Sequence, residues 1–178
     1  MRYSDQPGVS CEIHVEADPT SVWALVIDIH LPPRLSPELD RVEWLGGADR
    51  PVVGAAFVGH NSHPRIGQWR TVSYITDLHE PRVFGWVVTD PEGRFAGTEG
   101  AADRSRPAAT WRYELEPEAT GTLLRQSVRI GPGRSGLSPI IDGAPEREGQ
   151  FVAARLDELR RNIGTTLGDI KTLAEAAR

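Results

Sequence analysis

The chain has 178 residues, of which 25% are charged and 39% hydrophobic, and its formal net charge is −5 at pH 7. This length predicts one domain, residues 1–178, large enough to build its own hydrophobic core. The single cysteine, Cys11, excludes an internal disulfide framework and a multi-cysteine zinc site.

The sequence also bears on location and partners. No stretch of it approaches the roughly 20 apolar residues that cross a bilayer, and residues 1–9 lack the apolar region of a signal peptide. Basic residues do not form a run, which disfavours nucleic acid and anionic membranes as partners. We therefore expect a cytoplasmic protein with no membrane or nucleic-acid partner, and the sequence leaves the oligomeric state open.

The first 40 residues predict one strand and two short helices. Apolar and polar residues alternate over 9–16, which is typical of a half-buried strand. Asp18 suits the N-cap of a helix and Pro19 its first turn, and apolar residues follow at helical spacing. A proline-rich stretch then leaves room only for a short second helix around 34–39.

The middle of the chain predicts six further strands separated by turn residues. They cover 41–45, 55–61, 68–78, 82–89, 110–116 and 122–130. No helix-length connection separates them, so an antiparallel meander is expected. Residues 92–108 are rich in Gly, Ala and Arg and have no period, which predicts a long loop and a candidate lid.

The last segment predicts one long amphipathic helix over about 145–175. Apolar residues step by three or four from Val152 to Ala174. The fold class is therefore α+β: a helix-grip fold in which a curved seven-stranded antiparallel sheet wraps around the C-terminal helix, with two short helices after the first strand. Such a sheet is wider than one helix, so a cavity between them is expected.

A glycine-rich segment, 131–136, matches the GxGxxG pattern of dinucleotide sites. Pro132 and Pro139 interrupt any helix that starts there, and no parallel βαβ unit follows. We interpret the segment as a flexible linker and predict no cofactor.

Alternation on the strands assigns a set of aromatic side chains to the face that looks at the helix. They are Phe57, Trp69, Phe84, Trp86, Trp111 and Tyr113. One interpretation is plain core packing by large rings, and the other is a flat-walled apolar site for a ring or acyl chain. The polar Asn61 and Ser73 share the inward faces and are added to the candidate ligand contacts.

Other polar candidates lie near this face. Arg155 and Asn162 are seven residues apart, at one edge of the apolar stripe of the long helix. They are either solvent-facing edge residues or, with Asn61, a clamp on a substrate carbonyl. His63 follows Asn61 by two residues, so it is either a turn histidine before Pro64 or an inward acid-base group.

Metal binding is not predicted. His60 and His63 are three residues apart, with no clustered thiol or carboxylate, and alternation points His60 away from the face of Asn61. Cys11 is interpreted as a small core residue and not as a nucleophile.

Several segments together resemble a known family. They are 10–23, 53–57, Trp69, 84–86, 111–116 and 121–122. In these segments the chain is similar to polyketide cyclase/dehydrase-like proteins of the START and Bet v 1-like (SRPBCC) superfamily. The resemblance covers nearly the whole chain, residues 9–175. The resemblance implies a helix-grip fold with a hydrophobic ligand cavity.

The resemblance implies two functions. The first is binding of a hydrophobic small molecule, such as a polyketide, lipid or aromatic ligand. The alternative is a polyketide cyclase or dehydratase reaction, and a regulatory or interaction module is a third class. The aromatase/cyclases it resembles carry an inward arginine soon after the tryptophan of the fourth strand, whereas here Thr71, Ser73 and Ile75 face inward and Arg70 faces outward.

Overall fold

The computed structural model describes residues 1–95 and 103–177. The strands are β1 (Gly8–Val15), β2 (Leu39–Trp44), β3 (Ala56–His63), β4 (Gly67–His79), β5 (Val83–Thr89), β6 (Ala109–Glu118) and β7 (Gly121–Ile130). The helices are α1 (Pro19–Val26), α2 (Pro32–Leu35), α3 (Ser138–Gly143) and α4 (Glu148–Ala176), with short 3-10 turns η1 (Tyr3–Asp5) and η2 (Pro145–Arg147). The seven strands form one antiparallel sheet in the order β1-β7-β6-β5-β4-β3-β2. The predicted fold class is confirmed.

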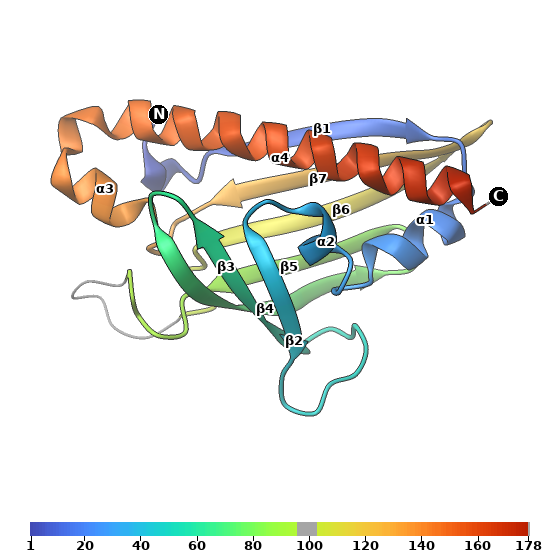
Figure 1. Ribbon diagram of the computed structural model, residues 1–178, viewed down its shortest axis with the longest axis horizontal. Helices are drawn as coiled ribbons and strands as arrows, with labels where there is room; N and C mark the ends of the chain where they lie inside the picture. The colour runs from blue at the N-terminus through green and yellow to red at the C-terminus, as the bar shows by residue number, and fades with distance from the viewer. Residues whose placement is uncertain (96–102, 178) are drawn as a thin grey trace.

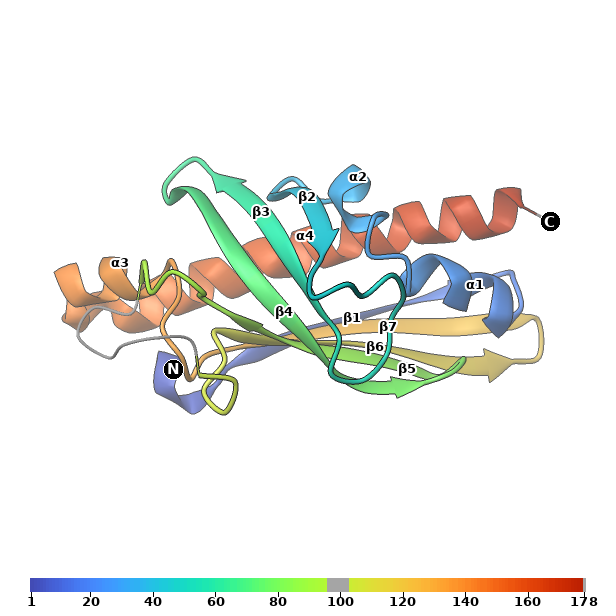
Figure 2. The same ribbon diagram turned by 90° about the horizontal axis from the view of Figure 1, so that it is seen from below.

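Helix α4 crosses the molecule from end to end and lies along β1 and β7 (Figure 1). Strands β2 to β4 run obliquely to the other strands, as the right-handed twist of a sheet requires (Figure 2). The predicted apolar stripe of α4 is buried throughout: Val152, Leu156, Leu159, Ile163, Leu167, Ile170 and Ala174. Its burial against the sheet forms the centre of the core.

Two helical segments differ from the sequence-based expectation. Helix α2 begins at Pro32 and not near residue 34, because prolines fit the first turn of a helix, and Pro37 disfavours a helical Ser36. The segment after β7 is not only a linker: α3 forms there, with Pro139 in its first turn. In both places proline starts a helix where we expected it to prevent one.

A register shift in β4 decides which side chains face the helix. Ile75 lies opposite Trp86, but after the shift at Thr76 it is Leu78 that lies opposite Phe84. Asp77 is thereby moved to the outer face, where it binds Arg112. The irregularity places the apolar Ile75 and Leu78, and not Asp77, on the inner face at this end of the strand.

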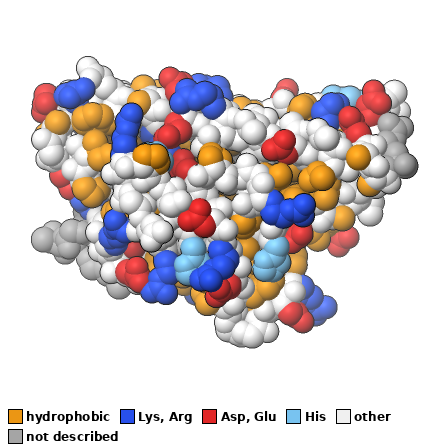
Figure 3. Space-filling view, in the orientation of Figure 1, with side chains coloured by type: hydrophobic (Ala, Val, Ile, Leu, Met, Phe, Trp, Pro, Cys, Tyr) orange, Lys and Arg blue, Asp and Glu red, His pale blue; other side chains and the backbone are white. Residues whose placement is uncertain are grey.

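The surface carries charges of both signs. On the face drawn in Figure 3, acidic and basic side chains are interspersed, and the described residues there form no extended patch of one sign. Within the described ranges, no helix is long and apolar enough to cross a membrane.

Candidate functional site

The centre of the candidate site is an aromatic wall, defined as Phe84, Trp86, Trp111 and Tyr113. The β5–β6 register places Phe84 opposite Tyr113 and Trp86 opposite Trp111. Trp86 is the hub: its ring centroid lies 5.0 Å from that of Phe84, 5.9 Å from that of Tyr113 and 6.2 Å from that of Trp111, which is stacked on it. Adjacent strands thus present one continuous aromatic surface.

The wall is only partly covered. Phe84 and Tyr113 are buried, but Trp86 and Trp111 remain partly exposed although they pack against the core. Large rings on an inner face are normally buried because each ring removes a large apolar area from water. Partial exposure here means that some apolar surface next to the core remains in contact with solvent.

The other predicted aromatic residues extend this surface towards β3 and β4. Phe57 is buried and meets Trp44 edge-on at 5.9 Å between ring centroids. Trp69 meets Phe95 edge-on at 6.5 Å. Phe95 is buried although it lies in the loop after β5, and sequence analysis missed it because a lone apolar residue in a loop has no period.

Three segments meet at the end of the molecule where α3 lies (Figures 1 and 2). Arg94, in the loop after β5, donates to the Ile66 carbonyl at the β3–β4 turn over 2.9 Å. Arg134, in the segment before α3, donates to the Phe95 carbonyl. A Cβ on Gly136 would lie 2.8 Å from the Ile66 side chain, so the backbone approaches that turn closely. The predicted lid, 92–108, falls partly on residues 96–102, outside the described residues.

A second feature is a polar seam between α4 and the β2–β3 edge, formed by Glu38, His63, Arg155, Glu158 and Asn162. Arg155 donates to both oxygens of Glu38, over 2.6 Å and 2.8 Å, and to Glu158 over 2.7 Å. Asn162 also donates to Glu38, over 3.2 Å. The side chains of Arg155 and Glu38 are 20% and 15% exposed, so this bidentate pair is largely withdrawn from water.

His63 joins the seam from the end of β3, which extends to this residue. Its Nδ1 accepts from the Arg65 backbone N–H over 3.1 Å, and its Nε2 lies 3.1 Å from Glu158 Oε1. These partners assign the proton to Nε2, which donates to Glu158. The side chain is 10% exposed, and both ring nitrogens are occupied.

In the seam, two carboxylates surround the single guanidinium of Arg155. Burial alone would lower the pKa of Arg155, but the hydrogen bonds and charges of Glu38 and Glu158 outweigh it and raise that pKa. Burial alone would raise the pKa of Glu158, but hydrogen bonds from Arg155 and His63 lower it. Glu38, His63 and Glu158 have ligand atoms within 4.8 Å of one another, a spacing that fits a metal ion. Arg155 already binds both carboxylates, so a metal would have to displace it.

Sequence reasoning found three members of the seam and missed Glu38 and Glu158. It also grouped Asn61 with Arg155, and the structure does not bring these two into contact. Asn61 donates to the Gly59 carbonyl and to Thr71, each over 3.2 Å, within the β3–β4 pair. Ser73 is buried on the inner face, opposite Phe57.

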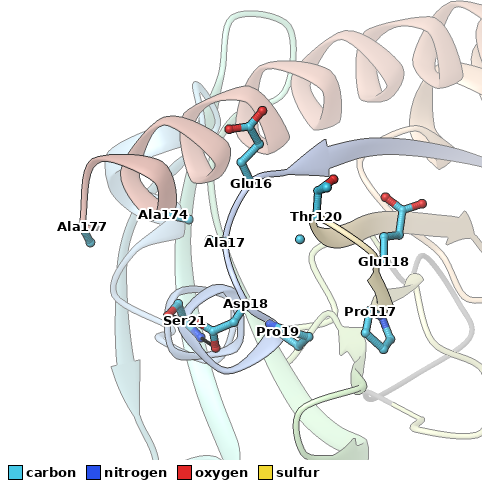
Figure 4. A pocket seen from close by; sticks show the side chains of 11 residues that line it. Glu16, Ala17, Asp18, Pro19, Ser21, Pro117, Glu118, Thr120, Ala174 and Ala177 are labelled. Carbon is cyan, nitrogen blue, oxygen red and sulfur yellow. Dashed lines mark hydrogen bonds between the residues drawn. The ribbon is translucent and has the colours of Figure 1, made fainter.

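An open hollow of about 570 Å³, lined by none of the wall residues, lies where β1 leads into α1 beneath the end of α4 (Figure 4). Its lining includes Glu16, Asp18 and Glu118. Asp18 is occupied in capping α1 through the Thr20 and Ser21 amides, and Glu118 is bound to His14. This solvent-open, acidic lining does not suit an apolar ligand.

A comparison with known protein families agrees with the helix-grip fold and its aromatic wall. Residues 6–164 match the family described as "Polyketide cyclase / dehydrase and lipid transport". The chain belongs to this family. Its predicted membership of the START and Bet v 1-like superfamily is confirmed. No curated protein matches the chain significantly.

Solved structures agree with the family. The Polyketide_cyc-like protein Cgl2372 from Corynebacterium glutamicum is 28% identical, with 96% of this chain and 92% of that chain covered and a TM-score of 0.62. The Zhui aromatase/cyclase from Streptomyces sp. R1128 is 16% identical, with 95% and 93% covered and a TM-score of 0.65. Ara h 8.0201 is 11% identical, with 96% and 98% covered and a TM-score of 0.58. The last two similarities show the fold alone.

Proposed function

We propose that this member of the polyketide cyclase/dehydrase family binds a hydrophobic small molecule against the aromatic wall. The observation that carries the proposal is the partial exposure of Trp86 and Trp111 on the inner face of the sheet. Flat rings of this kind favour a planar ring system or an extended acyl chain. Phe57 and Trp69 would extend the contact surface.

The test is a titration with N-phenyl-1-naphthylamine, an apolar probe whose emission rises when it leaves water. We expect saturable binding at one site per chain. Trp86→Ala should raise the Kd about tenfold, because a buried ring contributes roughly 1.5–3 kcal/mol. Tyr74→Ala is the matched control, since Tyr74 pairs with Val87 on the outer face and its ring lies 3.5 Å from the Arg104 guanidinium. Absence of saturable binding would contradict the proposal.

The alternative is a cyclase or dehydratase reaction with His63 as the acid-base group. The Glu158–His63 contact supports it, because a carboxylate that holds an imidazole fixes its tautomer and orientation. In this arrangement neither ring nitrogen is free, so proton removal from a substrate requires His63 Nδ1 to release the Arg65 backbone N–H.

His63→Gln separates the two functions on a poly-β-ketone substrate. A catalytic His63 predicts a fall in kcat of ~10²-fold or more with unchanged probe binding. An unchanged kcat would remove His63 from the mechanism, whereas absence of turnover by the wild-type protein would leave ligand binding as the function.

A further inference from the structure

Gln126 is a buried polar residue without a partner. It lies on β7 between the buried Leu124 and Val128, so its side chain shares their inner face. The residue is 6% exposed, and its Oε1 accepts no hydrogen bond from any residue that the structure describes. An unsatisfied amide in this position destabilises the folded protein unless another molecule satisfies it.

Tyr113 lies directly opposite Gln126 in the β6–β7 register. Side chains that are opposite one another in an antiparallel pair lie on the same face with their Cβ atoms about 5 Å apart. Tyr113 is 2% exposed, and burial is the one cause that shifts the pKa of its hydroxyl. Burial raises the pKa of this phenol, so the hydroxyl keeps its proton and remains a donor.

Two other buried polar side chains in the described residues have hydrogen-bond partners. Thr122 donates to the Ala17 carbonyl over 2.8 Å, and Thr89 donates to the Val72 carbonyl over 3.1 Å. More than nine in ten buried polar groups in folded proteins have such partners. A buried acceptor without a partner, directly opposite a buried phenol, is therefore an exception that calls for a third group.

The position of this pair links it to the aromatic wall. The Tyr113 ring is itself part of the wall, 5.9 Å from the Trp86 ring. On its other side Gln126 lies opposite Cys11 of β1, whose thiol contacts the Arg160 carbonyl of α4 over 3.7 Å. The Tyr113–Gln126 pair thus forms the β7 edge of the wall.

We propose that the ligand carries a phenolic or enolic hydroxyl on its planar apolar body, and that this hydroxyl binds between Tyr113 and Gln126. A hydroxyl accepts one hydrogen bond and donates another. It therefore satisfies the Tyr113 O–H donor and the Gln126 Oε1 acceptor together. The inference rests on the proposed function, because the hydroxyl reaches the pair only when the apolar body lies on the wall.

The test compares 2-naphthol with 2-methoxynaphthalene as competitors of N-phenyl-1-naphthylamine. The two differ only in whether the oxygen can donate, and the methyl ether is the more apolar. We expect wild-type protein to bind 2-naphthol at least ~10-fold more tightly. Gln126→Leu should reduce that preference to less than ~3-fold and leave 2-methoxynaphthalene binding intact. Gln68→Leu, an exposed change of the same kind on β4, should keep the preference.

The outcomes separate the two proposals. Saturable binding of both competitors without a preference for 2-naphthol in wild-type protein would overturn the hydroxyl site and leave the wall proposal standing. A preference that survives Gln126→Leu would overturn it equally. If the probe itself does not bind saturably, the proposed function fails, and the hydroxyl site fails with it.

Discussion

The aromatic wall and the polar seam both lie between the sheet and α4, and they differ in whether their polar atoms have hydrogen-bond partners. In the seam, Glu38, Arg155 and His63 each have two or more partners. At the edge of the wall, the amide oxygen of Gln126 has none among the described residues. Polar groups that have hydrogen-bond partners within the protein stabilise its structure, whereas polar groups without such partners are available to a ligand.

The separation follows from where each region sits in the sheet. The seam lies at the β2–β3 edge, where the curved sheet returns to α4 and would otherwise be open. The wall lies on the central strands β5 and β6, which are fixed by neighbours on both sides. A rigid central surface, next to a β2–β3 edge that the polar seam stabilises, is suited to binding a ligand without local unfolding.

Glu38→Gln should break the seam with the largest effect on stability. It leaves Arg155 largely buried with one charged partner instead of two, so we expect a loss of about 2 kcal/mol in the free energy of unfolding. Chemical denaturation measures the loss, and Asp40→Asn, an exposed carboxylate on β2, should change stability by less than about 0.5 kcal/mol. Probe affinity of Glu38→Gln should stay within about twofold of the wild-type value. A tenfold loss of probe affinity in Glu38→Gln would mean that the seam and the wall form one ligand site.

Trp111→Ala should lower the probe affinity, which Glu38→Gln leaves nearly unchanged. It removes the ring stacked on Trp86, so we expect about tenfold weaker probe binding, or about 1.4 kcal/mol. Fluorescence titration measures this. Equal affinity in wild-type and Trp111→Ala protein would place the ligand elsewhere.

Gln126→Leu should stabilise the empty protein by about 1 kcal/mol, because leucine removes a buried acceptor without a partner. Thermal unfolding without ligand tests this, with Gln68→Leu as the exposed comparison. A lower Tm for Gln126→Leu would mean that Gln126 is already satisfied in the empty protein.

Glu158→Gln should have the smallest effect, a loss below about 1 kcal/mol at pH 7, since Glu158 is one-third exposed. Because folding lowers the pKa of Glu158, its carboxylate stabilises the protein above the unfolded value of about 4.3, and this contribution disappears as the pH falls through the lower folded value. The stability of Glu158→Gln should therefore fall less steeply than that of wild type below about pH 4.5. Parallel curves of stability against pH for wild type and Glu158→Gln would contradict this stabilising role of the Glu158 carboxylate.

The sequence predicted the strands, the inward aromatic residues and the buried stripe of α4 because alternation and helical period are local signals. It did not predict the seam. Glu38 follows a proline-rich stretch at the start of β2, and its partner Arg155 is 117 residues away. Nothing local in the sequence indicates so distant a pair.

Two other features were missed for different reasons. The register shift at Thr76 depends on pairing with β5, which periodicity within β4 does not contain. Gln126, in contrast, had a visible signal: a glutamine between inward Leu124 and Val128 on a predicted strand. Treating a polar residue on an apolar face as a candidate contact would have found it.

The most direct test of the central claim is to locate a bound apolar ligand by intermolecular NOEs to assigned side chains. We predict cross-peaks from 2-naphthol to the indole protons of Trp86 and Trp111. Cross-peaks to Ala17, Thr120 and Ala174, which line the open hollow at the C-terminal end of α4, would contradict the account.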